Sequence, residues 1–194
     1  MSLPNATPSL FTYFNSIQKI SSNAEEALKA ISFLIETPKN KHVQEIGQTC
    51  RTYYFVTAGL ARIYYLKDGI EVTEYFAFEN DMIIRAESLF TGNPSKKAIQ
   101  AIEKTKLIGI PASKLEILFN SFPEIERLFR KIMEASYVSY VNRMESLQFH
   151  SAEERYIQLI SDFPELLEKI PLKHISSYLG ITQVSLSRIR ANIR

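Results

Sequence analysis

The residue types and spacing that point most clearly to a function lie in the last two dozen positions, PLKHISSYLGITQVSLSRIRANIR. Every charged side chain in this segment is basic. On a helix that turns 100° per residue, the apolar side chains of the second half share one side. That side holds Leu186, Ile189 and Ile193, and the opposite side holds Val184, Ser187, Arg188 and Ala191. A helix can enter the major groove of DNA when its outward face is slim, and an arginine there can bond both acceptors of a guanine. The segment therefore predicts a helix that reads base edges through Arg188.

Neighbouring residues extend this predicted DNA contact. No acidic residue follows Glu168, so the local electric field favours a polyanion. Lys173, Arg190 and Arg194 lie where they could hold phosphates. The predicted DNA-binding residues are Thr182, Gln183, Val184, Ser187, Arg188, Arg190 and Lys173.

A helix-turn-helix must position these side chains. Leu172, Ile175 and Leu179 recur at helical spacing and predict a first helix with an apolar inward face. Gly180 supplies the left-handed residue that ends this helix, and Thr182 is a good N-cap for the second. An ordinary helical hairpin that caps the domain is the alternative interpretation.

The segment ISSYLGITQVSLSRIR resembles the C-terminal winged-helix motif of the Crp/Fnr family of bacterial transcription regulators. Upstream, YYFVTAGLARIYYLKDGIEVTEYFAFENDMI resembles the β-roll sensor domain of that family. The segment SAEERYIQLISDFPEL resembles the first helix of its DNA-binding domain, in the branch common among Bacteroidetes. The resemblance implies a homodimer on an inverted-repeat site in double-stranded DNA, a small-molecule effector, and RNA polymerase as a further candidate partner.

The effector site departs from the pattern that the resemblance implies for cyclic-nucleotide binders. There a glycine-glutamate element and a later arginine with a small hydroxyl residue hold the ribose and cyclic phosphate. Here the upstream element reads Arg85 and Ala86, and Lys96 and Lys97 stand where the arginine and hydroxyl residue would be. We therefore expect an effector other than cyclic AMP; a solvated lysine loop with no ligand is the alternative. The candidate pocket residues are Glu87, Ser88, Lys96 and Lys97.

A long helical segment, from Pro123 to about Phe149, contains no glycine and no proline after its start. Its apolar residues alternate in spacings of four and three, which keeps one seam facing a partner helix. The predicted dimer seam is Phe129, Met133, Tyr137, Tyr140, Met144 and Leu147. Arg130 interrupts the upstream end of this repeat, so packing of the stripe on its own β domain is the alternative.

Composition is typical of a soluble protein with a sizeable core, since 45% of the 194 residues are hydrophobic. The N-terminal segment lacks a charged lead and a long apolar run, which predicts a cytoplasmic protein without a membrane span. His42, His150 and His174 lie in three different predicted elements, and Cys50 has no histidine near it in sequence. We therefore expect no enzyme, no metal site and no cofactor. A ligand-binding β-barrel module whose tail contacts proteins is the second functional hypothesis.

Turn residues and hydrophobic periodicity predict a helix, then a compact, mostly antiparallel barrel or sandwich, and then an all-helical tail. The resemblance implies that this is an α+β fold with a jelly-roll-like β-roll, a dimerisation helix and a winged helix-turn-helix. Ser22 with Glu25 predicts a capping box before the helical pattern AEEALKAISFLI, and strands are expected from Val43 to about Pro111. Two more capping boxes are expected, at Ser121 with Glu124 and at Ser151 with Glu154. The expected domains are a β-roll sensor with N-terminal helices over 1–120, the dimerisation helix over 121–150, and the DNA-binding domain over 151–194.

Overall fold

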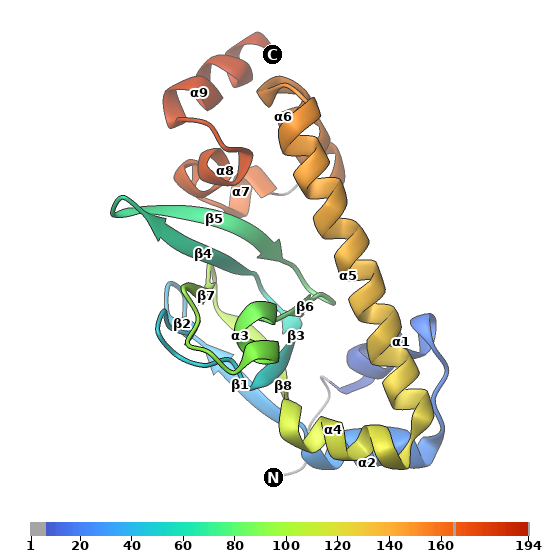
Figure 1. Ribbon diagram of the computed structural model, residues 1–194. Helices are drawn as coiled ribbons and strands as arrows, with labels where there is room; N and C mark the ends of the chain where they lie inside the picture. Colours follow the sequence, from blue (N-terminus) through green and yellow to red (C-terminus); the bar gives the residue numbers. More distant parts are fainter. Residues whose placement is uncertain (1–6, 165, 194) are drawn as a thin grey trace.

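The computed structural model describes residues 7–164 and 166–193, which form a β-roll, a helical layer on one side of it, and a helical C-terminal tail (Figure 1). The strands are β1 Phe33–Thr37, β2 His42–Gln44, β3 Thr52–Ala58, β4 Ala61–Lys67, β5 Ile70–Ala77, β6 Met82–Ile83, β7 Lys97–Ala101 and β8 Thr105–Pro111. The helices are α1 Thr7–Ile17, α2 Ser22–Ile31, α3 Ala86–Thr91, α4 Ala112–Ser121, α5 Pro123–Phe149, α6 Ala152–Asp162, α7 Leu166–Lys169, α8 Leu172–Leu179 and α9 Gln183–Asn192.

The strands pair antiparallel in two four-stranded sheets, in the orders β1-β8-β3-β6 and β2-β7-β4-β5. Residues of strand β3 contribute to two hydrophobic clusters, because successive side chains point to opposite faces of the sheet. Tyr53 and Phe55 pack with the helical layer, whereas Tyr54 and Val56 pack with residues of both sheets. The predicted jelly-roll-like β-roll is confirmed.

The hairpin between β4 and β5 follows from its turn residues. Asp68 and Gly69 have φ values of 53° and 78°, and Lys67 pairs with Ile70 across the turn. Two consecutive residues at positive φ match the twist of the flanking strands. The KDG turn signal in the sequence therefore gives a two-residue connection.

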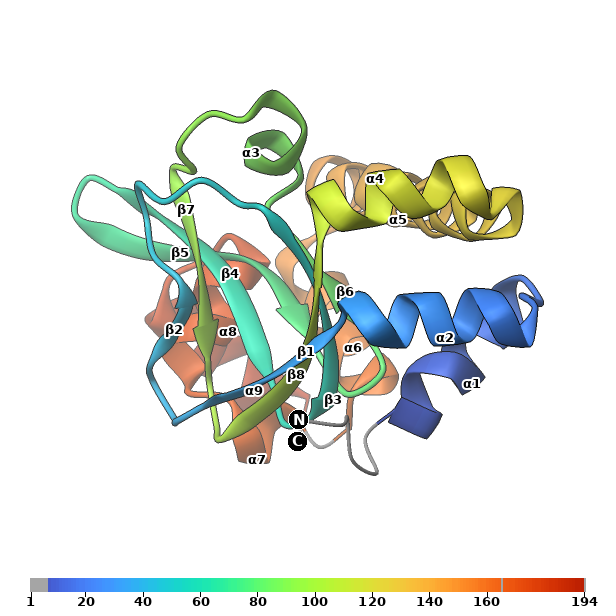
Figure 2. The same ribbon diagram turned by 90° about the horizontal axis from the view of Figure 1, so that it is seen from below.

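Helices α1, α2, α4 and the first part of α5 cover one side of the roll (Figure 2). Phe14, Leu28, Leu115 and Ile125 are fully buried between these helices and the sheet β1-β8-β3-β6. Their burial anchors the start of α5, from which the rest of α5 extends past the roll towards the C-terminal tail (Figure 1).

Three local predictions for the chain before α5 are wrong. Helix α2 is capped by Ser21, whose side chain accepts from the Ala24 amide, and not by Ser22. It ends at Ile31, and Phe33 to Ile35 pair with β8 instead of continuing the helix, so strands begin well before Val43. Ser121 is the last residue of α4, and Glu124 accepts a hydrogen bond from Ser21 at 2.9 Å, so the expected capping box at Ser121 does not form.

The C-terminal half agrees more closely with expectation. Helix α5 spans Pro123–Phe149 as predicted, and Ser151 and Glu154 form the expected capping box at the start of α6. The described residues after Pro111 are helices and connections, so the wing strands that the resemblance implies are not found among them. No helix in the described ranges is both long and apolar enough to cross a membrane.

Candidate nucleic-acid interface and effector pocket

The helix-turn-helix is built from α8 and α9. Gly180 has φ of 70° and caps α8, as its position in the sequence predicts. Thr182 caps α9 by accepting a hydrogen bond from the Ser185 amide at 3.1 Å. Both ends of the turn are therefore fixed by the residue types that the sequence analysis identified.

An apolar core holds the two helices together. Ile175, Leu179 and Leu186 are almost fully buried, whereas Leu172 and Ile189 are partly buried at the edge of the same core. Ile193 does not complete the inward face of α9, because it is 39% exposed. The inward face thus ends one turn earlier than predicted.

The outward face of α9 is open to solvent. Gln183, Val184, Ser187 and Arg188 are exposed, and Val184 is 62% exposed. Small side chains flank Arg188 on this face, so the helix can approach a groove closely and present one guanidinium.

Two of the predicted phosphate contacts lie on described residues of these two helices. Lys173 on α8 is exposed, and Arg190 on α9 is half-buried. Arg194, the third predicted phosphate contact, lies outside the described residues. Their roles as phosphate contacts stay predictions.

Two arginines that the sequence analysis missed fix the end of α8. The Arg143 guanidinium, from α5, lies 4.0 Å from the centre of the Tyr178 ring and donates to the Tyr178 carbonyl. Arg155, from α6, donates to the Leu179 carbonyl at 2.8 and 3.2 Å. Basic side chains satisfy the last carbonyls of a helix in this way. No sequence spacing identifies these residues, because they come from other helices.

The four candidate effector residues do not converge. Glu87 and Lys96 are exposed. Ser88 is 2% exposed and has a structural role, because it accepts from the Cys50 amide at 2.9 Å and donates to the Asn93 carbonyl at 2.5 Å. Lys97 is paired with Glu74, with 2.5 Å between Nζ and Oε1.

A different group of charges occupies this part of the roll. Arg85 is 6% exposed, and its guanidinium lies 3.4 Å from Glu74 Oε2 and 3.4 Å from Ser95 Oγ. Burial lowers the pKa of Arg85, and the carboxylate of Glu74 opposes that shift. Glu74 on β5 is therefore shared between Arg85 and Lys97. Both cations already hold an anion, which belongs to the protein.

The predicted dimer seam divides into two parts along α5. Phe129 is 3% exposed and packs against Phe14, Tyr53 and Phe119, so it belongs to the core of its own domain. Met133 is partly buried at the edge of that core. Downstream, Tyr137, Tyr140, Met144 and Leu147 are 69%, 56%, 40% and 39% exposed. Phe129 and Met133 therefore pack on their own domain, as the alternative interpretation expected. The four downstream residues of the stripe are exposed and do not.

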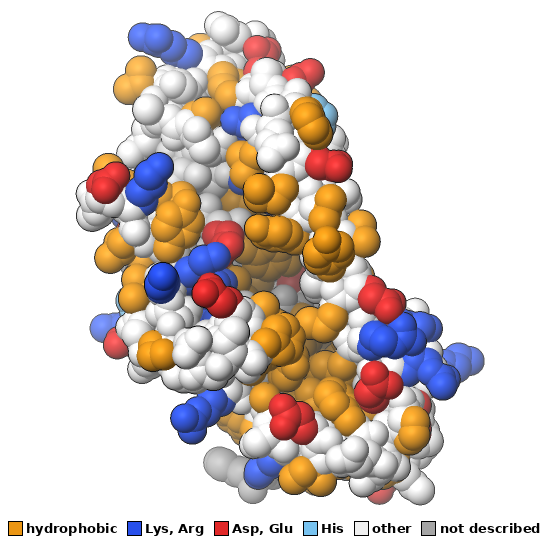
Figure 3. All heavy atoms as spheres, viewed as in Figure 1, with side chains coloured by type: hydrophobic (Ala, Val, Ile, Leu, Met, Phe, Trp, Pro, Cys, Tyr) orange, Lys and Arg blue, Asp and Glu red, His pale blue; other side chains and the backbone are white. Residues whose placement is uncertain are grey.

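Apolar side chains also gather on the molecular surface beside this part of α5 (Figure 3). The view shows a hollow between the helix and the roll, with hydrophobic side chains along both sides of it.

Among the described residues, no group of three histidine, cysteine or carboxylate side chains could hold a metal ion.

Comparison with known proteins gives the fold a context. Residues 34–122 match the family model of the cyclic nucleotide-binding domain. No curated protein matches the chain.

Several solved structures share the fold over most of the chain. FixK2 from Bradyrhizobium japonicum is 19% identical, with a TM-score of 0.72, and the match covers 84% of each chain. The c-di-GMP responsive global regulator CLP from Xanthomonas campestris is 15% identical, with a TM-score of 0.71 and coverage of 89% of this chain and 91% of that one. A protein of Eubacterium rectale described as a transcriptional regulator of the Crp/Fnr family is 20% identical, with a TM-score of 0.70 and coverage of 93% of this chain and 85% of that one. The chain thus has the fold of Crp/Fnr-type regulators.

Proposed function

We propose that the chain is a sequence-specific DNA-binding transcription regulator of the Crp/Fnr type, and not an enzyme. The observation that carries this proposal is the outward face of α9, where Arg188 is exposed among small side chains. Thr182 caps this helix, and Leu186 anchors it in the core shared with α8. The basic residues of the same segment and the absence of acidic residues after Glu168 add a field that attracts DNA.

We further propose that two copies pair through the downstream half of α5. Four exposed apolar side chains there continue the spacing of a helix–helix seam. Two recognition helices related by a two-fold axis would enter major grooves about 34 Å apart, on an inverted repeat. The domains would be those expected from the sequence: sensor over 1–120, dimerisation helix over 121–150 and DNA-binding domain over 151–194.

The β-roll would act as the sensor of this regulator, for a small molecule other than cyclic AMP. The match of residues 34–122 to the cyclic nucleotide-binding domain supports a ligand-binding role for the roll. The pairing of Arg85 and Lys97 with Glu74 argues against a simple cyclic phosphate. The resemblance of residues 151–166 supports a place in the Bacteroidetes-type branch. A regulator of this type would act in the cytoplasm, with RNA polymerase as a candidate partner.

A binding assay separates this proposal from the hypothesis of a ligand-binding module whose tail contacts proteins. The full chain is titrated with a random 30-base-pair duplex at low salt, with a selected duplex, and with heparin as an anionic polymer without a groove. We expect a steep loss of affinity with salt and a clear preference for selected duplex over both other ligands. Equal affinity for all three would favour the second hypothesis.

A further inference from the structure

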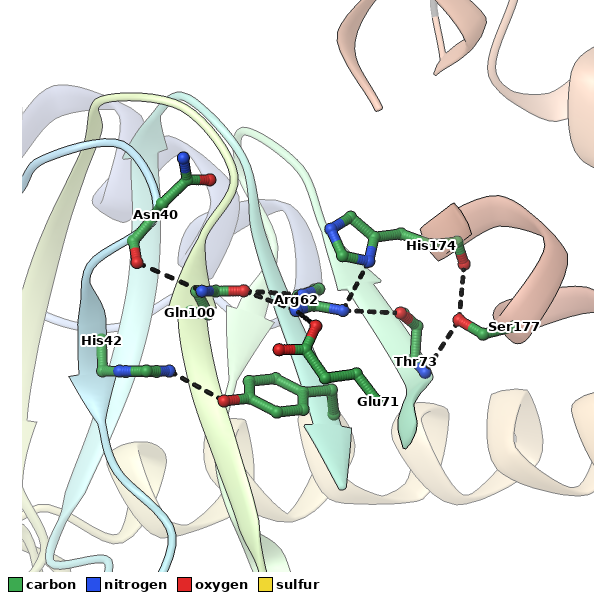
Figure 4. Close-up of polar contacts among 9 residues, drawn as sticks. Asn40, His42, Arg62, Glu71, Thr73, Gln100, His174 and Ser177 are labelled. Atoms are coloured by element: carbon green, nitrogen blue, oxygen red, sulfur yellow. Dashed lines mark hydrogen bonds and ion pairs between the residues drawn. The ribbon is translucent and has the colours of Figure 1, made fainter. Parts of the chain in front are cut away.

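A buried arginine joins the β-roll to the helix-turn-helix. Arg62 on β4 is 1% exposed and has the largest of the fully buried side chains among the described residues. Its guanidinium lies between the sheet β2-β7-β4-β5 and helix α8 (Figure 4). A charge in such a place is tolerated only when its hydrogen-bonding groups have partners.

Every N–H group of this guanidinium has an acceptor. Nε and Nη2 donate to Gln100 Oε1 at 2.9 and 2.6 Å, and Nη2 also pairs with Glu71. Nη1 donates to Thr73 Oγ1 at 3.2 Å and to His174 Nδ1 at 2.7 Å. Since arginine stays protonated and has no acceptor, Nδ1 of His174 must be the acceptor, with the ring neutral and its proton on Nε2.

A second set of contacts holds the next turn of α8. The Thr73 amide donates to Ser177 Oγ at 3.1 Å, and this hydroxyl donates in turn to the His174 carbonyl at 3.0 Å. The rings of Phe76 and Tyr178 lie 5.1 Å apart beside these bonds. Strand β5 and α8 are thus joined over two successive turns of the helix.

The position of α8 determines the position of α9. The two helices share a core that also contains Leu60, Phe76 and Ile102 of the β-roll. The docked arrangement leaves the outward face of α9 open, since Val184 is 62% exposed and Arg188 is exposed. Docking on the roll therefore orients this face without covering it.

We propose that Arg62 is a positioning residue that holds α8 on the β-roll and so sets the direction in which the Arg188 face of α9 points. This inference rests on the proposed function. A dimer that reads two half-sites needs both recognition helices at a fixed separation. Without the Arg62 contacts the helix-turn-helix gains freedom that DNA binding must then remove, so operator affinity falls.

The same strands carry the charged group in the sensor. Glu71 and Thr73 lie on β5 with Glu74, and Gln100 lies on β7 with Lys97. A ligand that displaces Glu74 would act on the strands that hold α8. Arg62 thus connects the strands of the roll to α8, which in turn positions the recognition helix α9.

The experiment measures docking and DNA binding separately in the full chain. Spin labels at Lys39→Cys and Asn192→Cys, both exposed positions, report the distance between roll and α9 by double electron–electron resonance. The labelled chain is mixed with an excess of unlabelled chain, so that each dimer carries at most one labelled copy. Cys50 is 2% exposed, so the introduced cysteines should label selectively. Operator affinity is measured by fluorescence anisotropy on a duplex selected with the wild-type chain.

Arg62→Met and His174→Leu should broaden the distance distribution and weaken operator binding by about tenfold. His174→Asn keeps an acceptor near the position of Nδ1 and should restore both readouts. Tyr64→Phe is the matched control, because it removes the 2.9 Å bond to His42 on the same sheet but keeps the ring that lies 4.3 Å from the Arg62 guanidinium. If Arg62→Met fails to fold, the two His174 variants decide the question.

A narrow distribution in both Arg62→Met and His174→Leu would overturn the inference, and so would a broad distribution with unchanged or increased affinity. If the wild-type chain binds no duplex, the proposed function fails. The distance distributions then test only whether Arg62 holds α8 on the β-roll.

Discussion

Arg188 is the residue on which discrimination between DNA sequences should depend most. Its exposed guanidinium can bond both acceptors of a guanine. Arg188→Ala should weaken specific binding by about 1–3 kcal/mol and leave folding and dimerisation intact. Competition between selected and random duplex measures the effect. Lys173→Ala is the control, since losing a phosphate contact lowers the affinity for all sequences alike. An unchanged ratio of specific to random affinity in Arg188→Ala would show that Arg188 does not read a base.

Val184 should favour a thymine in each half-site. Its side chain is 62% exposed at the start of α9 and has no hydrogen-bonding group, so it can pack against a thymine methyl but cannot bond a base edge. Val184→Glu should replace this preference by cytosine, whose amino group a carboxylate accepts. Selection from a randomised duplex library with both proteins tests this. Identical selected half-sites would show that this position does not read a base.

Cyclic AMP should bind weakly. A cyclic phosphate would have to displace Glu74 from Arg85 and Lys97, and Ala86 leaves no carboxylate for the ribose hydroxyls. Buried hydroxyls without partners cost about 1–3 kcal/mol each, which moves a micromolar ligand towards millimolar affinity. Calorimetric titration should therefore show no saturation at low micromolar concentration. Glu74→Gln removes the competing carboxylate and should bind phosphate more tightly than the wild type.

Single residues were predictable where local chemistry decides their role. Gly180 and Thr182 occupy their expected places because turn and cap geometry depend on neighbours in sequence. Arg62 and Arg85 were missed, because their burial is produced by partners such as His174, 112 positions away from Arg62. Glu87 and Lys96 are exposed, and their roles as pocket residues stay predictions, since alignment of a loop does not determine which side chains turn inward.

At the scale of elements, the downstream half of α5 should hold two copies together. Tyr140 is 56% exposed within the apolar seam, and a buried charge there would lack a partner. Tyr140→Glu should weaken the dimer by at least about 2 kcal/mol. Analytical ultracentrifugation measures the dissociation constant.

Asn142→Glu provides the matched control, since it places the same charge about 200° further round the helix. Asn142 is exposed, and this variant should remain a dimer. Equal dissociation constants for Tyr140→Glu, Asn142→Glu and the wild type would show that α5 is not the dimer contact.

Elements were predicted well where a helical pattern is long and no strand pairing competes with it. Helix α5 matches its predicted bounds because its 27 residues contain no breaker after Pro123. The segment after α2 was misjudged because the spacing of Phe33 to Ile35 fits a helix, whereas the structure pairs them with β8. Gly109 permits this pairing, since a Cβ there would lie 2.6 Å from the Phe33 ring. Such long-range pairing overrides a short local pattern.

At the scale of the whole molecule, the two-part organisation was predictable, and the contact between the parts was not. The β-roll follows from the turn residues that separate its strands, and the helix-turn-helix follows from Gly180 and Thr182 between its two helices. Their docking depends on Arg62, Thr73 and Ser177, whose spacing in sequence carries no common pattern. Contacts between domains are therefore where the structure adds most to the sequence.

Docking should make the stability of the molecule depend on pH through His174. Its ring is 6% exposed and faces Arg62 on β4 and Glu71 on β5, with Lys173 beside it on α8. Burial, followed by the charges of Arg62 and Lys173, lowers the pKa of His174 to about 4, and Glu71 opposes this shift. An unfolded histidine has a pKa of about 6.5. Between these values the unfolded chain binds a proton that the folded chain does not, so the folded state loses stability as pH falls from about 6.5 to about 4.

The measurement is the melting temperature of wild type and His174→Asn across this range. Asn does not titrate, so subtracting the two curves removes the contribution of the other ionisable groups. The wild-type advantage should be constant above about pH 6.5, shrink by a few degrees as pH falls to about 4, and change no further below that. A difference independent of pH would mean that His174 is free to take up its proton in the folded state, which contradicts its role as the acceptor for Arg62.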